Sequence, residues 1–233
     1  IQEEFPLPVF LENNANAYGI AEKNFGTGRK YKSFISLIVD EGIGSAIIID
    51  KKLFRGKGGF SNEIGHMTID INGLKCNCGN TGCLELYAVI PKILEQLEYS
   101  LDLGAASQFF EEIRSERKIT WDDFISGLEM NDILASRLLQ KEANFLGTAL
   151  VSTINLLEPE AIFLSSKIAK AGDAILVPLI DFIKSRTFTR NFQIPEIFVS
   201  EIEDASISGG AAMVFEHLIS GELGEYEKVF GDN

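Results

Sequence analysis

Apolar residues form short unbroken runs early in the chain and recur at helical spacing over most of its second half. The runs at 34–40 and 43–50 are rich in β-branched residues and are separated by Glu41-Gly42, a pattern that predicts two antiparallel strands joined by a short turn. Further short strands are expected at 53–54, 161–164 and 196–199.

Helices are predicted where apolar residues return every three or four positions. They are expected at 15–25, 84–99, 105–117, 120–128, 131–157, 169–186 and 208–219. Pro91 is expected to bend or divide the second of these helices, because proline removes a backbone donor and clashes with the preceding turn. Strands followed by alternating helices and strands indicate an α/β layer fold.

All three cysteines, Cys76, Cys78 and Cys83, lie within the glycine-rich stretch 61–87, which also contains His66. One imidazole and three thiolates are a known tetrahedral zinc set, and a closed four-ligand site is structural rather than catalytic. The alternative is that these are reduced thiols in a surface loop. Three tightly spaced cysteines favour a metal site over a disulfide framework, and they indicate a reducing, cytoplasmic setting.

Two carboxylates, Glu63 and Glu85, lie just outside the predicted metal ligands. A metal would make the loop rigid and hold both carboxylates in place. If both carboxylates face one ligand, they would accept hydrogen bonds from neighbouring hydroxyl groups of that ligand. Taken alone, each glutamate is better explained as a solvated surface charge.

Charge limits the possible partners of the chain. It has 233 residues and a net charge of −13, with 34 acidic and 21 basic residues. Because nucleic-acid binding depends on a basic surface, this chain is not expected to hold DNA by itself. We find no apolar run of the roughly 20 residues that a membrane helix needs. The first residue is not methionine and lies close to an apolar run, so we expect a fragment of a longer protein.

The stretch around the cysteines resembles the ROK family of repressors, open reading frames and kinases. The matching residues are Glu63-Ile64-Gly65-His66, Gly73 and the run CNCGNTGCLE from Cys76 to Glu85. ENNANA at 12–17 resembles the sugar-binding loop of the family, and the stretch 42–60 resembles its strand pair and glycine-rich loop. The resemblance extends over nearly all the chain.

This resemblance implies the C-terminal larger part of an actin-like (ribonuclease H-like) sugar-kinase fold, a mixed sheet flanked by helices with a zinc-bound loop. Residues 31–208 would form the large subdomain, with 1–30 and 209–233 bordering a subdomain that precedes this chain. Sugar would be bound by Asn13, Asn14, Glu63, His66 and Glu85. Structural zinc would be held by His66, Cys76, Cys78 and Cys83.

Three departures from the kinases of the family affect catalysis and nucleotide binding. Asn14 occupies the position of the catalytic aspartate, and an amide cannot act as a general base. Asp40-Glu41-Gly42 stands where the kinases have Gly-Thr-Gly for nucleotide, and Ser165-Ser166-Lys167 replaces a glycine-rich turn. Together they predict that ATP is not used and that no residue is catalytic.

The sequence therefore predicts a non-catalytic sugar-binding effector domain of a ROK-type transcriptional regulator. Such a regulator is expected to be a dimer or tetramer that binds DNA only through an upstream domain. One alternative is a fragment of an ATP-dependent sugar kinase, similar to glucokinases or fructokinases, with an altered catalytic base. Another is a zinc-stabilised oligomerisation module without a ligand.

Overall fold

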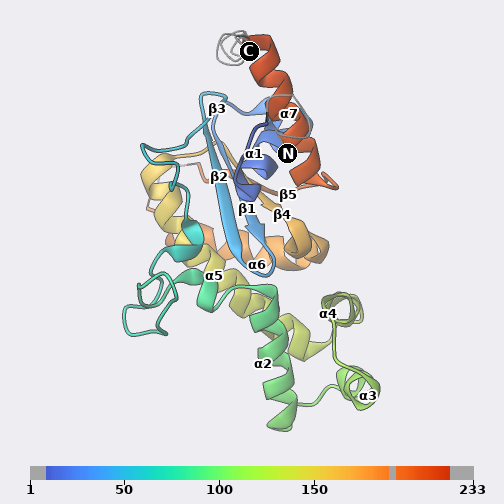
Figure 1. Ribbon diagram of the computed structural model, residues 1–233. Coiled ribbons are helices and arrows are strands. Elements are labelled where there is room, and N and C mark those ends of the chain that lie inside the picture. Colours follow the sequence, from blue (N-terminus) through green and yellow to red (C-terminus); the bar gives the residue numbers. More distant parts are fainter. Residues whose placement is uncertain (1–8, 189–192, 221–233) are drawn as a thin grey trace.

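A five-stranded mixed sheet lies at the centre of the protein, whose computed structural model describes residues 9–188 and 193–220 (Figure 1). The strands are β1 Phe34–Val39, β2 Ile43–Ile49, β3 Lys52–Leu53, β4 Ala161–Ser165 and β5 Glu196–Val199. Their order is β3-β2-β1-β4-β5, with antiparallel pairing of β1, β2 and β3 and parallel pairing of β1, β4 and β5. All the predicted strands are confirmed. The ends of the two predicted bordering segments, at 1–8 and 221–233, lie outside the described residues.

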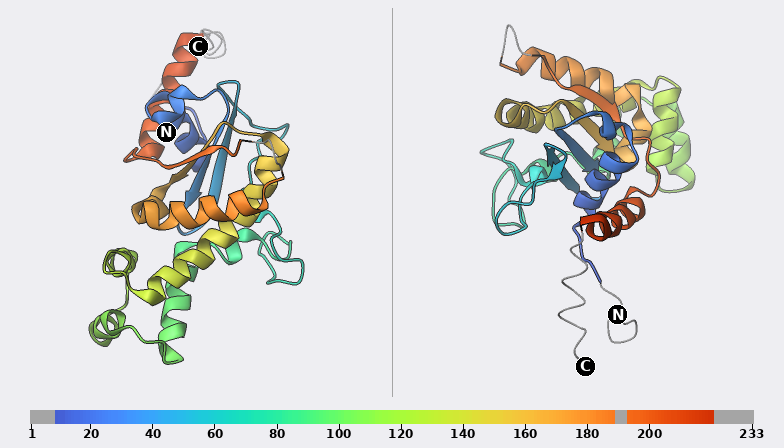
Figure 2. Two further views of the ribbon diagram at one scale, coloured as in Figure 1. Left: turned by 180° about the vertical axis from the view of Figure 1, so that it is seen from behind. Right: turned by 90° about the horizontal axis from the view of Figure 1, so that it is seen from above.

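Helices cover both faces of this sheet (Figure 2). On one face lie α5 Ile133–Leu157 and α6 Asp173–Arg186, and on the other lie α1 Asn14–Asn24 and α7 Ala205–Ser220. Side chains that alternate along the strands enter different apolar clusters, so every residue of the central strand β1 is buried.

Three further helices, α2 Ile90–Asp102, α3 Gln108–Glu116 and α4 Trp121–Glu129, lie beside the N-terminal half of α5, away from the sheet (Figure 1). Phe110 and Phe124 are fully buried in the same core cluster as the α5 residue Leu139. The first turn of α4 has a capping box, in which the Thr120 hydroxyl accepts from the Asp123 amide and the Asp123 carboxylate accepts from the Thr120 amide.

Two helix predictions were wrong in their details. The helix expected at 84–99 begins at Ile90, after a separate 3-10 turn at Leu84–Leu86. Pro91 lies in its first turn, where the missing N–H has no intrahelical partner to lose, so the proline starts the helix instead of bending it. The helix expected at 169–186 begins at Asp173, because Gly172 has a φ of 49° and separates it from a 3-10 turn.

In the part of the chain that is described, no helix is both long and apolar enough to span a bilayer.

Candidate functional site

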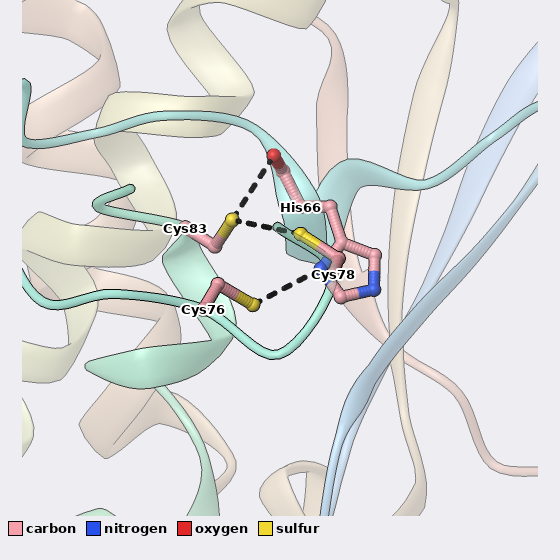
Figure 3. Close-up of side chains that lie close together, drawn as sticks. All are labelled: His66, Cys76, Cys78 and Cys83. Atoms are coloured by element: carbon pink, nitrogen blue, oxygen red, sulfur yellow. Dashed lines mark hydrogen bonds between the residues drawn. The ribbon is translucent and has the colours of Figure 1, made fainter. Parts of the chain in front are cut away.

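The four predicted metal ligands, His66, Cys76, Cys78 and Cys83, converge (Figure 3). One ligand atom from each lies within 4.8 Å of all the others. The sulfurs of Cys78 and Cys83 are 3.7 Å apart, and the Cys76 sulfur is 3.8 Å from Nδ1 of His66. Ligands held at about 2.0–2.3 Å from a tetrahedral zinc ion are separated by roughly 3.5–3.8 Å. The cluster therefore has the spacing and the donor set of a metal site.

Backbone contacts close the loop that carries these ligands. The Cys76 amide donates to the Asn80 carbonyl at 2.9 Å, and the Gly79 amide donates back to the Cys76 carbonyl at 3.0 Å. Gly82 has a φ of 71°, a conformation that favours glycine, and it directly precedes Cys83. This turn brings Cys83 back beside Cys78.

The three sulfurs have different environments. Cys76 and Cys83 are buried, whereas Cys78 is exposed. Burial, reinforced by the neighbouring thiols, raises the pKa of Cys83 to about 12. The backbone amide of Asn80 donates to Cys78 and lowers the pKa of that thiol. A cation among these groups is what would hold the buried sulfur as a thiolate.

His66 connects the metal cluster to the rest of the candidate site. Its Nδ1 is directed at Cys76, and its second ring nitrogen points away from the three sulfurs (Figure 3). The Cys83 sulfur also contacts the His66 backbone carbonyl, at 3.5 Å. One imidazole can therefore bind a metal through one nitrogen and offer the other to a ligand.

The start of β2 brings the predicted sugar-binding segments together. A Cβ atom on Gly44 would lie 2.8 Å from Cβ of Ala15, so the N-terminus of α1 lies directly against this strand. A Cβ on Gly65 would collide with the carbonyl oxygen of Ile43, so the turn between Glu63 and His66 also lies against it. These close approaches place Asn13 and Asn14, and the turn that begins at Glu63, along the same strand.

Glu85 lies at the other end of the loop that carries the predicted metal ligands, and it also contacts β2. Its Oε2 accepts a hydrogen bond from the Ile43 amide at 3.3 Å. Asn13 caps α1, because its Oδ1 accepts from the Ala15 amide at 2.8 Å. Asn13, Asn14 and Glu63 are exposed. Neither of two surface cavities, of about 650 and 670 Å³, is lined by these residues.

The residues at the predicted nucleotide side bind one another. Lys167 forms ion pairs with Asp40 at 2.7 Å and with Glu41 at 3.1 Å, and the Ser166 hydroxyl donates to Asp40 at 2.8 Å. These contacts join the β1–β2 turn to the turn after β4, and the two carboxylates, Asp40 first, raise the pKa of Lys167. Acidic residues outnumber lysines around the adjoining cavity of about 650 Å³. Its charged lining residues are Glu41, Glu95, Glu98, Asp102, Lys118 and Lys167.

Sequence reasoning missed two contacts beside the site. Glu12 was predicted only as part of a motif and Arg55 was assigned no role, yet the two side chains form an ion pair. Lys167 was also interpreted only as a departure from a glycine-rich turn, although this lysine binds both acidic residues of the opposite turn. An acidic residue just before an N-cap was a signal that Glu12 contacts the start of α1, but not that it pairs with Arg55. We find no sequence signal that pairs Arg55 or Lys167 with its partner.

Comparison with known proteins identifies the family. The family model described as "ROK family" matches residues 1–217. This chain belongs to the ROK family. The ROK chain is 36% identical to a xylose repressor from Bacillus spizizenii, over 94% of this chain and 53% of the repressor. It is 30% identical to a glucokinase from Halalkalibacterium halodurans, over 96% of this chain and 68% of the enzyme.

A solved ROK structure confirms the predicted fold, a mixed sheet flanked by helices from an actin-like sugar-kinase architecture. It is a ROK family transcriptional regulator described as a homolog of the Escherichia coli Mlc protein, with a TM-score of 0.81 and 28% identity. The match covers 91% of this ROK chain and 52% of that protein. This ROK chain spans about half the length of the curated xylose repressors it matches.

Proposed function

We propose that this chain is the non-catalytic, sugar-binding effector region of a ROK-type transcriptional regulator. The observation that carries the proposal is the pairing of Lys167 with Asp40 and Glu41. In the kinases of this family, the turn at 40–42 serves the nucleotide. Here the turn is bound to another part of the protein, and its two carboxylates outweigh the single charge of Lys167, so the net negative charge opposes a polyphosphate.

The residue at the catalytic position supports the same proposal. The amide of Asn14 cannot take a proton from a sugar hydroxyl, and the loss of such a base lowers a rate by roughly 10²–10⁴-fold. The same amide both donates and accepts hydrogen bonds. Asn14 therefore suits the binding of a hydroxyl group and not its activation.

We assign the recognition of sugar to the residues along the start of β2. Glu63 and Glu85 accept hydrogen bonds from sugar hydroxyls, and Asn13 and Asn14 contribute amide groups from the start of α1. His66 contributes the ring nitrogen that faces away from the cysteines. Four relatives that are 30–36% identical to this chain are named xylose repressor or putative xylose repressor, so xylose is the first sugar to test.

Zinc is the metal that best fits the Cys₃His donor set. When bound, it supplies no chemistry beyond cross-linking the loop, since four protein ligands leave no open coordination position. His66, Cys76, Cys78 and Cys83 would hold it. The metal would thereby fix the segment between Glu63 and Glu85 against β2.

The complete regulator is proposed to be a cytoplasmic dimer or tetramer whose DNA-binding domain precedes this chain. In this arrangement residues 31–208 form the large subdomain, and 1–30 and 209–233 border the preceding subdomain. The packing of α1 against α7 is consistent with these two segments acting as one unit. A net charge of −13 is consistent with DNA contacts being made elsewhere.

Calorimetry on the complete protein that contains this chain tests the proposal. We expect one sugar from a panel of D-xylose, D-glucose and N-acetylglucosamine to bind, and Glu63→Gln to weaken that binding. Glu129→Gln, an exposed change in α4, is the matched control and should bind as the wild type does. Failure of every pentose, hexose and amino sugar to bind would exclude the effector role.

The second candidate is a sugar kinase with another base, and the glucokinase relative is the observation that favours it. A coupled assay with ATP and the same sugars separates the two functions. We expect no turnover above background. Turnover that is lost when Glu63 is substituted would show that the chain is part of a sugar kinase and not of a regulator.

A further inference from the structure

We propose that the ion pair between Glu12 and Arg55 is a positioning pair, which ties together the two segments that carry the candidate sugar-binding residues. The inference rests on the proposed sugar site. Neither residue is assigned a contact with the sugar. Their role is to fix the separation between the start of α1 and the turn at Glu63.

The Glu12 carboxylate organises the start of α1. Its Oε1 accepts hydrogen bonds from the Asn13 amide and from Nδ2 of Asn16, each at 2.9 Å. Its Oε2 binds Nη1 of Arg55. The Glu12 side chain is only 10% exposed, and these three donors lower its pKa despite the opposing effect of burial. The Glu12 carboxylate therefore links the backbone that holds Asn13 and Asn14 to Arg55.

Arg55 stands at the base of a loop that leads to Glu63. The carbonyl of Phe54 accepts a hydrogen bond from Nδ2 of Asn62 at 2.7 Å, which closes the loop 55–61. Asn62 has a φ of 70°, and its own carbonyl accepts from the Ser45 hydroxyl. Glu63 follows at once. A short series of contacts thus runs from Glu12 through Arg55 and the loop base to Glu63.

Apolar residues two positions before Glu12 and two positions before Arg55 also anchor the two segments. Phe10 and Leu53 pack against a small cluster that consists of Ile20, Ala212 and Met213. Loss of a partly exposed ion pair therefore leaves the fold in place, and such pairs contribute only about 0–1 kcal/mol to stability. The ion pair instead sets the relative position of the two anchored segments, because it fixes where their ends meet.

The pair differs chemically from its possible replacements. Glutamine at position 12 keeps an oxygen for the Asn13 and Asn16 donors but removes the charge that attracts Arg55. Lysine at position 55 keeps that charge without the planar fork of arginine. Comparison of Glu12→Gln and Arg55→Lys with Arg55→Met separates the loss of the ion pair from the loss of side-chain volume at position 55.

The test uses calorimetry and thermal unfolding of the complete protein with the sugar that the wild type binds. We expect Arg55→Met and Glu12→Gln each to raise Kd by roughly 10-fold, a change equal to about 1.4 kcal/mol. The double variant should be little weaker than either single one, since both break the same link. Arg55→Lys should recover most of the affinity. Melting temperatures should stay within about 3 °C of the wild type, consistent with a contribution of 0–1 kcal/mol.

Arg114→Met is the matched control, because Arg114 forms ion pairs with Asp102 and Glu111 at the α2–α3 end of the protein. It should leave Kd unchanged. Wild-type affinity in both Arg55→Met and Glu12→Gln, or strictly additive losses in the double variant, would overturn the positioning role. Failure of the wild type itself to bind any sugar would instead refute the proposed function on which this role rests.

Discussion

Substitution of Gly44 by alanine tests whether the start of α1 belongs to the sugar site. The added Cβ would lie 2.8 Å from Cβ of Ala15. An ordinary carbon–carbon contact is about 3.5–4.0 Å, so α1 must move away from β2 by roughly 1 Å. Overpacking of this kind costs about 1–3 kcal/mol, and alanine in a strand returns about 0.5–1 kcal/mol relative to glycine. The expected net destabilisation is about 0–2.5 kcal/mol.

The substitution should affect sugar binding more strongly than it affects folding stability. Asn13 and Asn14 move with α1, and each lost hydrogen bond to a sugar costs about 0.5–1.5 kcal/mol. Two such bonds correspond to a rise in Kd of roughly 5- to 150-fold. The melting temperature should fall by no more than about 10 °C, since 1 kcal/mol shifts it by about 2–4 °C in a chain of this size.

Calorimetry and thermal unfolding on the same preparations measure both quantities. Gly210→Ala is the control, because a Cβ there meets nothing within 4 Å and alanine favours the α7 helix. It should melt at or slightly above the wild-type temperature and bind the sugar normally. If Gly44→Ala melts lower but binds with wild-type affinity, the start of α1 is not part of the site.

Three further predictions concern the metal, a buried acid and the turn at residue 40. Chelation should remove one zinc ion per chain, measured by atomic absorption, and should lower both the melting temperature and the affinity for sugar. Burial raises the pKa of Glu142 to about 8, so stability should decline between about pH 4.5 and 8, at up to about 1.4 kcal/mol per pH unit. Glu142→Gln should remove that decline in denaturant titrations. The stabilisation that Lys167 gains from Asp40 is present below the ordinary lysine pKa and is lost above it. The difference in melting temperature between the wild type and Lys167→Met should therefore shrink above about pH 10.

Local patterns predicted most of the fold. Apolar runs located all five strands, and the cluster of His66 with the cysteines was predicted because cysteines are few and closely spaced. Pro91 was misinterpreted because its effect depends on whether it falls inside a helix or in its first turn, which spacing alone does not decide. The ion pairs of Arg55 and Lys167 join residues 43 and more than 120 positions apart, and their pairing depends on the folded chain.

One turn, at residues 40–42, joins the residues at the predicted nucleotide side to those at the proposed sugar site. Asp40 and Glu41 bind Lys167 on one side of this turn, and the Ile43 amide donates to Glu85 on the other. Within the turn, the Asp40 amide donates to the Gly42 carbonyl at 3.0 Å. The ion pairs that fix this turn therefore also fix the strand start against which Glu85 is placed. If the proposed function holds, the residues that depart from the kinases would support the surface proposed to bind sugar.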